Sequence, residues 1–290
     1  MYYPSWGWGK KISWYGLLLA VGLLIPIPGF NQQIIRIVPV ISSGSDGFPD
    51  ATSTGVPAGT TLTVVNGDQD IVTNGTIIDS KDIRGCITVD APNVIIRKSK
   101  VSCPGIAIFN NSSNLLVEDT TIDCQGVLGG TAITWRNYTA RRINASDCEN
   151  VLWAEGDVTI EDSYIHDLIE YNIVTDPHPD GIQVPTSANI TIRHNRIYGM
   201  SRNLAFSNSA VTSSGGISNY LLTDNLLAGG GYTVYCDGIG NTNYRVTNNR
   251  FSTIFSPTVG FYGPIASCET TATQFSGNVY HETGLPLPGQ

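Results

Sequence analysis

Ionisable side chains are unusually dense between residues 166 and 183. The segment holds two of the chain's four histidines together with several carboxyl groups and a tyrosine. These side chains are His166, Asp167, Glu170, Tyr171, Asp176, His178 and Asp180. Histidine, carboxyl and phenol groups are the side chains that most often donate or accept protons in catalysis. We therefore predict a functional site in this segment, positioned by the elements on either side of it.

Those elements follow a repeat. A nine-residue pattern begins at residues 75, 93, 114, 137, 157, 189, 219, 243 and 272. At its second, fourth and ninth positions 25 of 27 residues are apolar or aromatic, although such residues make up 41% of the chain. None of the 18 residues at the fifth and sixth positions is apolar. The steps between starts, 18 to 32 residues, are those of a solenoid with insertions in some coils.

The second and fourth positions are spaced as alternate residues of a strand, which share one face. A coil of this length has room for short strands and turns, but not for a crossover helix in each repeat. Stacking the coils in parallel buries the second, fourth and ninth positions in one interior. The sequence therefore predicts an all-β fold over residues 46–290, a right-handed single-stranded parallel β-helix of about nine coils.

The longest step, 32 residues after residue 157, contains the ionisable segment. Insertions in loops carry function more often than the scaffold does. The strand after the insertion should point Ile182 and Val184 inward and Gln183 outward. His178 and Asp180 would then lie at the entrance of this strand, near Gln183. A hydrogen-bonded cluster of these three side chains that only closes the loop is an equally good interpretation.

Charged and amide side chains form further columns in this register. The fifth position alternates in sign over six coils: Asp79, Arg97, Glu118, Arg141, Glu161 and Arg193. Because strands of neighbouring coils lie about 4.8 Å apart, each charge should lie between two opposite charges. Arg193 and His194 are therefore interpreted as structural. The seventh position ends with Asn195, Asn225, Asn249 and Asn278, which predicts an asparagine ladder at a tight turn.

Four of the six cysteines fall at the eleventh or twelfth position of consecutive coils. Neighbouring coils bring such positions to the Cα separation that a disulfide requires. The predicted pairs are Cys86–Cys103, Cys124–Cys148 and Cys236–Cys268, and the main alternative joins Cys103 to Cys124. Disulfides in turn predict an exported chain.

The first 45 residues differ from the rest. An apolar stretch of 19 residues, 12–30, follows Lys10 and Lys11, which is typical of a signal peptide or an N-terminal membrane anchor. We expect residues 1–45 to form such a segment plus a linker, and the remainder to be extracytoplasmic, either secreted or anchored to the membrane. The chain has a formal net charge of −8, and a negative surface repels the phosphate backbone. Nucleic acid is therefore not an expected partner.

The periodic core, the asparagine column and the exported, Gly- and Thr-rich character resemble the pectate-lyase-like superfamily of right-handed parallel β-helices. The Gly55-Val-Pro-Ala-Gly-Thr-Thr-Leu62 and His178-Pro-Asp-Gly-Ile-Gln183 segments are similar to those of secreted bacterial and phage-associated β-helix repeat proteins. The resemblance covers residues 47 to 290 approximately. It implies binding to, or action on, polysaccharide along an outer face of the helix.

Within that resemblance, the predicted catalytic residues are His178, Asp180, Asp176 and Tyr171. A lyase or epimerase acting on an acidic polysaccharide needs a base for the C5 proton and an acid for the leaving oxygen. The order of Tyr171, Asp176 and His178 is similar to the Tyr and Asp-Pro-His elements of mannuronan C5-epimerases, although the Tyr–Asp spacing differs and Pro179 follows the histidine. A glycosidase would instead pair Asp176 with Asp180. Carboxylates of Asp176, Asp180 and Glu170 are a possible Ca²⁺ site without EF-hand spacing.

Substrate-binding candidates are Gln183, Arg136, Arg202 and Trp153. Aromatic side chains can stack on sugars, and Trp135, Tyr232 and Tyr235 share this expectation. Because the exported part is negative, an anionic polymer requires a locally basic groove. The arginines considered for it are Arg136, Arg141, Arg193, Arg196 and Arg202. Two rival hypotheses remain at this stage, a non-catalytic polysaccharide-binding or surface-structural protein and a phage tail component. The apolar N-terminal segment argues against the tail component.

Overall fold

The computed structural model describes residues 46–170 and 178–290, which all belong to one compact unit, Ser42–Gln290. The predicted N-terminal segment, residues 1–45, lies outside the described residues, as do Tyr171 and Asp176. Within the described ranges, no helix has the length and apolar character that a membrane span requires.

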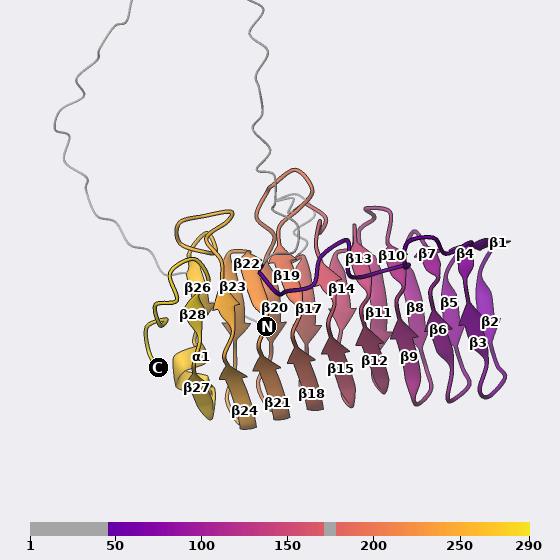
Figure 1. Ribbon diagram of the computed structural model, residues 1–290. Coiled ribbons are helices and arrows are strands. Elements are labelled where there is room, and N and C mark those ends of the chain that lie inside the picture. Colours follow the sequence, from indigo (N-terminus) through magenta and orange to yellow (C-terminus); the bar gives the residue numbers. More distant parts are fainter. Residues whose placement is uncertain (1–45, 171–177) are drawn as a thin grey trace, which may run out of the picture. The chain divides into compact units, whose positions relative to one another are not determined.

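The described chain forms three parallel sheets (Figure 1), and each coil contributes one strand to each of them in turn. Sheet A contains β1 (Thr63–Asn66), β4 (Lys81–Arg84), β7 (Lys100–Ser102), β10 (Thr121–Asp123), β13 (Asn144–Ser146), β16 (Tyr164–Ile165), β19 (Arg196–Gly199), β22 (Leu226–Gly229), β25 (Arg250–Phe251) and β28 (Val279–Tyr280).

Sheet B contains β2 (Gln69–Ile71), β5 (Ile87–Val89), β8 (Ile106–Asn110), β11 (Thr131–Trp135), β14 (Asn150–Trp153), β17 (Asp180–Val184), β20 (Ser209–Ser213), β23 (Tyr232–Cys236) and β26 (Gly263–Ala266). Sheet C contains β3 (Ile77–Asp79), β6 (Ile95–Arg97), β9 (Leu115–Glu118), β12 (Tyr138–Arg141), β15 (Val158–Glu161), β18 (Ala188–Arg193), β21 (Ser218–Thr223), β24 (Thr242–Thr247) and β27 (Gln274–Ser276). A short helix, α1 (Cys268–Thr271), follows β26. The predicted right-handed parallel β-helix is confirmed.

The core is the shared interior of the coils. Ile96, Ile192 and Val246, from the fourth position of the repeat, are all fully buried. The pairing of Ile78 with Ile96 shows that equivalent repeat positions lie in register on neighbouring coils. Each buried side chain therefore packs against the side chain at the equivalent position of the next coil. Burial of apolar surface thus stabilises the solenoid along its whole length.

The polar positions of the repeat correspond to its corners. Lys98, Asp119, Arg142 and Asp162, from the sixth position, have φ between +48° and +52°. Asn93, Asn114, Asn189, Asn219 and Asn243, from the first position, also have positive φ. Asn and Asp tolerate this left-handed conformation better than other residues that carry a Cβ. The recurrence of Asn at the start of the pattern therefore reflects the backbone of the turn.

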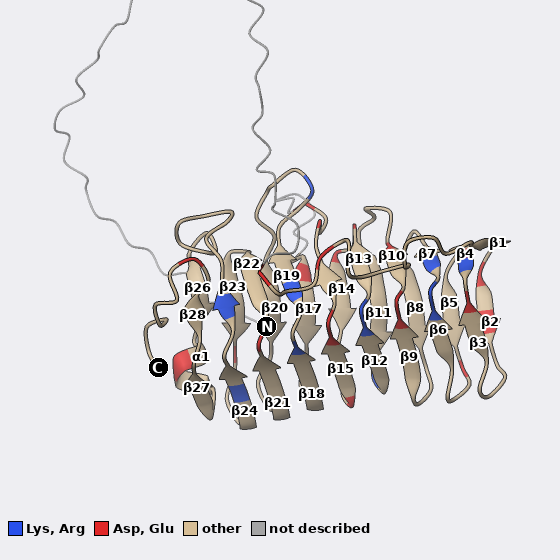
Figure 2. Ribbon diagram, viewed as in Figure 1, with Lys and Arg blue, Asp and Glu red and all other residues tan. Residues whose placement is uncertain are grey.

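The alternating charges form the predicted ladder on the outside of sheet C, where blue and red alternate from β6 to β18 (Figure 2). Arg97 contacts Asp79 at 2.6 Å, and Arg141 contacts Glu118 at 2.6 Å. Glu161 contacts Arg193 at 2.5 Å and lies 4.0 Å from Arg141 on its other side. Each inner member of the column is therefore flanked by opposite charges.

The asparagine ladder is also confirmed. The four side chains are buried and join neighbouring coils, with Asn225 Oδ1 accepting hydrogen bonds from both the backbone N–H and the Nδ2 of Asn195, at 2.9 and 3.0 Å. Asn225 Nδ2 in turn donates to Asn249 Oδ1 at 3.0 Å. Buried backbone groups at this corner are thereby satisfied by side chains.

All three predicted disulfides are present: Cys86–Cys103, Cys124–Cys148 and Cys236–Cys268. The first two lie between sheets A and B, and the third joins the last residue of β23 on sheet B to the first residue of α1. No free cysteine occurs in the described chain. Three disulfides indicate an oxidising, extracytoplasmic environment, because thiols are kept reduced in the cytosol.

Residues 46–62 form a strap that crosses the coils before the first strand. Arg196, whose side chain is 4% exposed, donates to Asp46 Oδ1 at 2.7 Å and to the Pro49 carbonyl at 2.6 Å. Further along the strap, Gly55 N donates to the Arg142 carbonyl at 2.8 Å. Gly55 has φ +75°, and a Cβ there would lie 2.5 Å from Thr121 Oγ1. Glycine thus allows the strap to lie directly on the strands.

Candidate functional site

The longest connections of the described coils run from sheet A to sheet B. They follow β16, β19 and β25. The two connections after β19 and β25 project from one edge of the solenoid (Figure 1). The ionisable segment belongs to the connection after β16. Its described parts, residues 166–170 and 178–183, therefore lie at the border between the outer faces of sheets A and B.

Asp180 begins β17, as expected, but its side chain is almost completely buried, with 1% of the residue exposed. Its Oδ1 accepts hydrogen bonds from Ser209 Oγ at 2.5 Å and Asn208 Nδ2 at 2.8 Å. Burial raises the pKa of Asp180 to about 7, and the nearby Glu149 carboxylate acts in the same direction, although the hydrogen bonds oppose them. The group is therefore protonated over part of the neutral range and can donate a proton.

His178, by contrast, is exposed. The structure places it two residues before Asp180 at the strand entrance, and Gln183 lies on the outer face of β17 between the buried Ile182 and Val184. The predicted alternation along this strand is thus confirmed. A hydrogen-bonded cluster of His178, Asp180 and Gln183 was the alternative interpretation. The described hydrogen bonds of the Asp180 side chain go instead to Asn208 and Ser209 on the following coil.

The outer face of sheet B carries one row of side chains in register. Phe109 pairs with Thr134, and Trp153, Gln183, Thr212 and Tyr235 pair in succession along the later coils. Ile133 pairs with Leu152, which places Thr134 beside Trp153. Planar groups therefore recur along this face at intervals set by the coil spacing, about 4.8 Å for neighbouring strands.

Two polar atoms in the middle of this row lack hydrogen bonds. Trp153 Nε1 and Gln183 Oε1 are both buried and have no partner in the described part of the chain. One is a donor and the other an acceptor, and they come from paired residues of β14 and β17. Buried polar groups are normally satisfied by protein, water or ligand. The row therefore contains one donor and one acceptor whose hydrogen bonds no described residue satisfies.

Aromatic side chains gather at the C-terminal end of the same face. Tyr232 contacts Tyr235, with ring centroids 5.4 Å apart, and Tyr262, at 5.6 Å. Phe261 lies against Tyr262 at 4.9 Å and against Phe206 at 5.7 Å. Phe261 and Tyr262 are 61% and 65% exposed. Burial raises the pKa of Tyr235, and the charge of Asp180 adds to the effect, so this cluster borders the Asp180 site.

Trp135 is the last residue of β11, and Arg136 follows it, near the start of the row that begins at Phe109. Trp135 has φ +79°, a conformation that is rare for a bulky residue with a Cβ. Its ring contacts Phe109 edge to face with centroids 6.0 Å apart. Arg136 Nη2 donates to Glu155 Oε2 at 3.1 Å, and 58% of its side chain is exposed. Arg136 is thus separated from Arg202, which lies in the connection after β19.

Arg202 belongs to a charged cluster on the sheet A side of the edge. It forms an ion pair with Asp147 and lies 3.9 Å from Asp167. Asp167 contacts His166 Nδ1 at 3.0 Å, and this hydrogen bond holds the pKa of Asp167 below its ordinary value. Burial raises the pKa of Asp147, whereas the Arg202 charge opposes the increase. The His166 ring stacks on Tyr164 at 4.0 Å.

Two of the three carboxylates proposed for Ca²⁺, Glu170 and Asp180, hydrogen-bond to neighbouring side chains. Glu170 hydrogen-bonds Asn203 Nδ2, and Asp180 faces Asn208 and Ser209. Among the described side chains, no group of three or more His, Cys, Asp or Glu residues is arranged to hold a metal ion. Asp176, the third proposed ligand, is outside the described residues.

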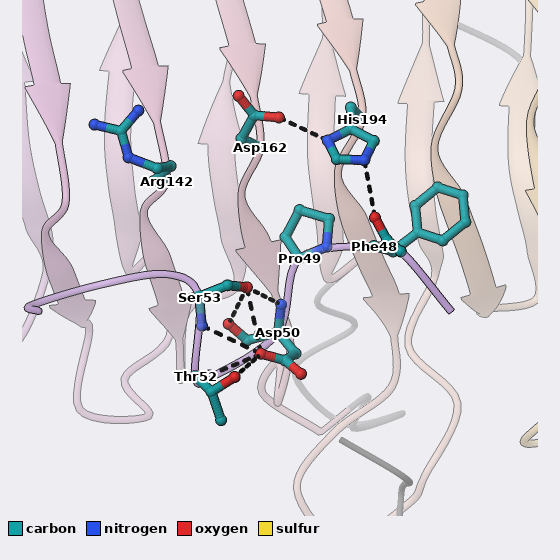
Figure 3. A pocket seen from close by; sticks show the side chains of 9 residues that line it. Phe48, Pro49, Asp50, Thr52, Ser53, Arg142, Asp162 and His194 are labelled. Carbon is teal, nitrogen blue, oxygen red and sulfur yellow. Dashed lines mark hydrogen bonds and ion pairs between the residues drawn. The ribbon is translucent and has the colours of Figure 1, made fainter. Parts of the chain in front are cut away.

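A separate pocket of about 340 Å³ lies between the strap and the turns that connect sheets C and A. Figure 3 shows His194 between Asp162 and the strap. His194 Nδ1 lies 2.6 Å from Asp162 Oδ1, and Nε2 lies 3.1 Å from the Gly47 carbonyl, while the Phe48 ring stacks on the imidazole at 5.7 Å. His194 therefore occupies its predicted place in the charge columns, paired with Asp162 of the preceding coil.

Comparison with known proteins gives no match to a family model, a curated protein or a solved structure.

Two features of the site were missed from the sequence. The first is the inward direction of Asp180, which pairs with Asn150 and Ser209 on neighbouring coils; the alternation around Gln183 already implied it. The second is the stacked pair of Tyr164 and His166 on sheet A, whose spacing of two residues on a strand was a usable signal because alternate residues share a face.

Proposed function

We propose that this protein is an exported, carbohydrate-active β-helix that binds polysaccharide along the outer face of sheet B. The proposal depends on one observation, the in-register row that contains Phe109, Trp153, Gln183 and Tyr235. Aromatic faces bind the apolar faces of pyranose rings, and polar groups beside them bind the hydroxyls. Membership of the pectate-lyase-like superfamily is part of the same proposal.

A polysaccharide presents a similar ring at regular intervals, and the β-helix presents similar side chains at regular intervals along its axis. The unpartnered Trp153 Nε1 and Gln183 Oε1 supply a donor and an acceptor in the middle of the row. The exposed aromatic cluster around Tyr262 extends the same face toward the C-terminus. An extended sugar chain uses such a surface better than a compact ligand does.

The export route is the second part of the proposal. The disulfides support an oxidising compartment, and the lysine-flanked apolar segment at residues 12–30 supports delivery as a secreted or membrane-anchored protein. Polysaccharides of the cell surface and its surroundings are the substrates that such a protein would meet.

A catalytic function, as lyase or epimerase, is the second candidate. The observation that favours it is the raised pKa of Asp180, about 7, because a general acid works best with a pKa near the working pH. Asn208 and Ser209 fix the orientation of its Oδ1. In this proposal His178, which is exposed at the strand entrance, is the candidate base. Asp180, which is 1% exposed, supplies the proton for the leaving oxygen only where substrate binding uncovers its carboxyl group.

Binding is tested with two truncations on the row, Trp153→Ala and Tyr235→Ala. Each should weaken the binding of oligosaccharides by about tenfold, which corresponds to roughly 1.4 kcal/mol. Leu116→Ala is the matched control, because Leu116 is a partly exposed residue on the outside of sheet C. Calorimetric titration of uronate and neutral oligosaccharides measures the effect. Unchanged affinity in both row variants, alongside binding by the wild-type chain, would exclude sheet B as the binding face.

Turnover is tested separately. The ultraviolet absorbance of an unsaturated uronate product reports elimination, and exchange of the C5 proton with solvent deuterium reports epimerisation. Asp180→Asn should abolish either signal and leave oligosaccharide affinity within about twofold. A wild-type chain that binds uronate polymers without either signal would reject the catalytic candidate and leave the binding proposal standing.

A further inference from the structure

The two ends of the solenoid differ in how their strand edges are covered. At the C-terminal end the chain folds back after β28, where Val279 forms an antiparallel bridge with Pro286 and Leu287 belongs to the core with 2% exposure. At the N-terminal end, β1, β2 and β3 are the terminal strands of the three sheets (Figure 1), and no strand of the described chain pairs with their outer edges. The first coil, residues 63–79, therefore presents three open sheet edges together.

The core is also exposed at this end. Val65 pairs with Ile83 and Ile71 with Val89. Val65 and Ile71 are only partly buried, whereas Ile83 and Val89, one coil later, are 1% and 0% exposed. Three other apolar side chains of the first coil are exposed: Val64 at 47%, Val72 at 72% and Ile77 at 53%. Because solenoids normally end in a repeat that covers the last coil, this end is a candidate interaction surface.

The backbone of the first coil has unused hydrogen-bonding groups. Gln69 N donates to the Cys86 carbonyl at 2.8 Å, and the Ile71 carbonyl accepts from Asp90 N at 2.9 Å. Alternate residues of a parallel strand bond to the same neighbour, so the N–H and C=O of Asp70 face away from the second coil. The three strands contain neither proline nor lysine, which are common blocks to edge pairing. Another strand can therefore add to this edge.

We propose that the first coil binds the first coil of a second copy of this chain, related by a two-fold axis perpendicular to the solenoid. Every strand of the inverted copy runs in the opposite direction, so the edges pair in the antiparallel sense. One of the three sheets pairs with its own counterpart, and the other two pair with each other. Such an interface is self-complementary and closes at two copies. The covered C-terminal end lacks the matching edges that a head-to-tail fibre requires.

Size and distance favour a second copy as the occupant. A standard interface uses about 20 to 30 residues on each side, and the first coil has 17, so a reversible dimer in roughly the micromolar range is expected. The chain before Asp46 starts far away, because Asp46 contacts Arg196 on β19, six strands from β1 in sheet A. At about 4.8 Å for each strand this is roughly 29 Å, which requires about nine extended residues. A second copy supplies an already folded edge instead.

Charge opposes this dimer and thereby gives it a signature. The first coil contains Asp68, Asp70 and Asp79 and no lysine or arginine. Asp79 pairs with Arg97, and Asp68 accepts the Cys86 N–H, so Asp70 is the main source of repulsion between the copies. Salt screens such repulsion, and association should therefore strengthen as ionic strength rises. An interface held by ion pairs would show the opposite dependence.

Crosslinking tests the geometry. All six cysteines are in disulfides, so an added cysteine is the single thiol of the chain. The full chain is studied in excess mild detergent, which places the apolar residues 12–30 of different copies in separate micelles. Three variants probe the three corners at this end with exposed positions: Thr61→Cys, Asn66→Cys and Val72→Cys.

A two-fold axis passes through one corner only. One of the three variants should therefore form a dimer with a short bismaleimide roughly fivefold faster than the other two, since the paired thiols react within one complex. Leu285→Cys, 62% exposed at the C-terminal end, is the control and should react no faster than the slower two. Equal rates in all four variants, or no dimer, would overturn the inference.

Two substitutions at one position test the edge pairing by sedimentation velocity over a range of concentrations. Asp70→Pro removes the N–H that faces away from the second coil and should weaken the dimer at least about tenfold. Asp70→Ala keeps this N–H and removes the charge, so it should bind at least as tightly as the wild type and depend less on salt. Equal dimerisation by wild type and a folded Asp70→Pro would overturn the inference.

Val72→Asp keeps the test decisive if Asp70→Pro lowers the thermal midpoint. Val72 is 72% exposed, so the fold should tolerate the change, while the added charge should weaken the dimer about tenfold at low salt. A wild type that stays monomeric at every concentration and salt would overturn the inference, whether its own N-terminal residues or another molecule covers the edge. None of these variants alters the four residues that support polysaccharide binding, so the two proposals fail independently.

Discussion

Asp180 Oδ1 and Ser209 Oγ lie 2.5 Å apart across two coils that are separated by 29 residues in the sequence. The aspartate and the serine begin paired strands, β17 and β20. Both residues are buried, and burial raises the pKa of Asp180 to about 7 from an ordinary value of 3.8. Because its pKa differs between the folded and unfolded states, the Asp180 carboxyl makes the free energy of unfolding depend on pH.

The sign of that coupling follows from the raised pKa. Between about pH 4 and 7 the folded state binds a proton at Asp180 that the unfolded state has released, so stability falls as pH rises through this range. The contribution is at most roughly 4 kcal/mol, from about 1.4 kcal/mol for each pKa unit. Asp180→Asn should keep the hydrogen-bond acceptor, flatten this pH dependence and be more stable than the wild type near pH 8.

Urea unfolding of the two proteins with intact disulfides, near pH 5 and about pH 8, measures the effect. Asp237→Asn is a suitable control because Asp237 is exposed. Parallel pH profiles for the wild type and Asp180→Asn would show that Asp180 is already ionised in the folded protein near neutrality.

The asparagine ladder predicts a large effect from a small deletion. Asn225 is fully buried and accepts the backbone N–H of Asn195, and its own Nδ2 donates to the Ile192 carbonyl. Asn225→Ala leaves these backbone groups without partners, and we expect a loss of roughly 3 kcal/mol in the free energy of unfolding. Asn219→Ala, in the exposed ladder at another corner, should cost less than about 1 kcal/mol. Chemical denaturation compares the two, and equal costs would contradict the role of burial.

The charge ladder should contribute unevenly along its length. The Glu161 side chain is 10% exposed and lies between Arg141 and Arg193, whereas Asp79 is 35% exposed and has one ion-pair partner, Arg97. We expect Glu161→Gln to cost about 1 kcal/mol and Asp79→Asn to cost clearly less, because solvent and salt screen the exposed pair. Thermal melting at low and high ionic strength measures both. A greater cost for Asp79→Asn would show that local burial does not set the strength of these pairs.

The fold was predictable from the sequence because every coil must satisfy the same pattern of buried and exposed positions. A parallel β-helix places every coil in the same environment, so positions such as Ile96, Ile192 and Val246 report one interior independently. The same register predicted the partners of the cysteines and the alternation of Glu161 with Arg193, which are 32 residues apart. Misplacing one coil would have broken several of these columns at once.

The candidate site was less predictable because it does not repeat. The insertion between β16 and β17 occurs once, so no neighbouring coil shows which way its side chains point. The left-handed backbone of Trp135 is likewise a single event, which composition and periodicity do not reveal. The strap over Arg196 depends on contacts between residues about 150 positions apart in the chain, beyond the reach of any local pattern.

Arg196 provides the last prediction, because its Nε and Nη2 groups attach the strap. Its side chain contacts Asp46, the Pro49 carbonyl and the Tyr198 hydroxyl, and it is 4% exposed. Arg196→Ala removes these contacts and should release residues 46–56 from the coils while the interior of the solenoid remains intact. Limited proteolysis followed by mass spectrometry should then detect cleavage in the strap at least tenfold faster than in the wild type, since protease sensitivity follows local opening. Arg84→Ala, at an exposed ion pair away from the strap contacts, should leave the rate unchanged. A strap as resistant in Arg196→Ala as in the wild type would place its anchorage in the Gly55 contact with Arg142 instead.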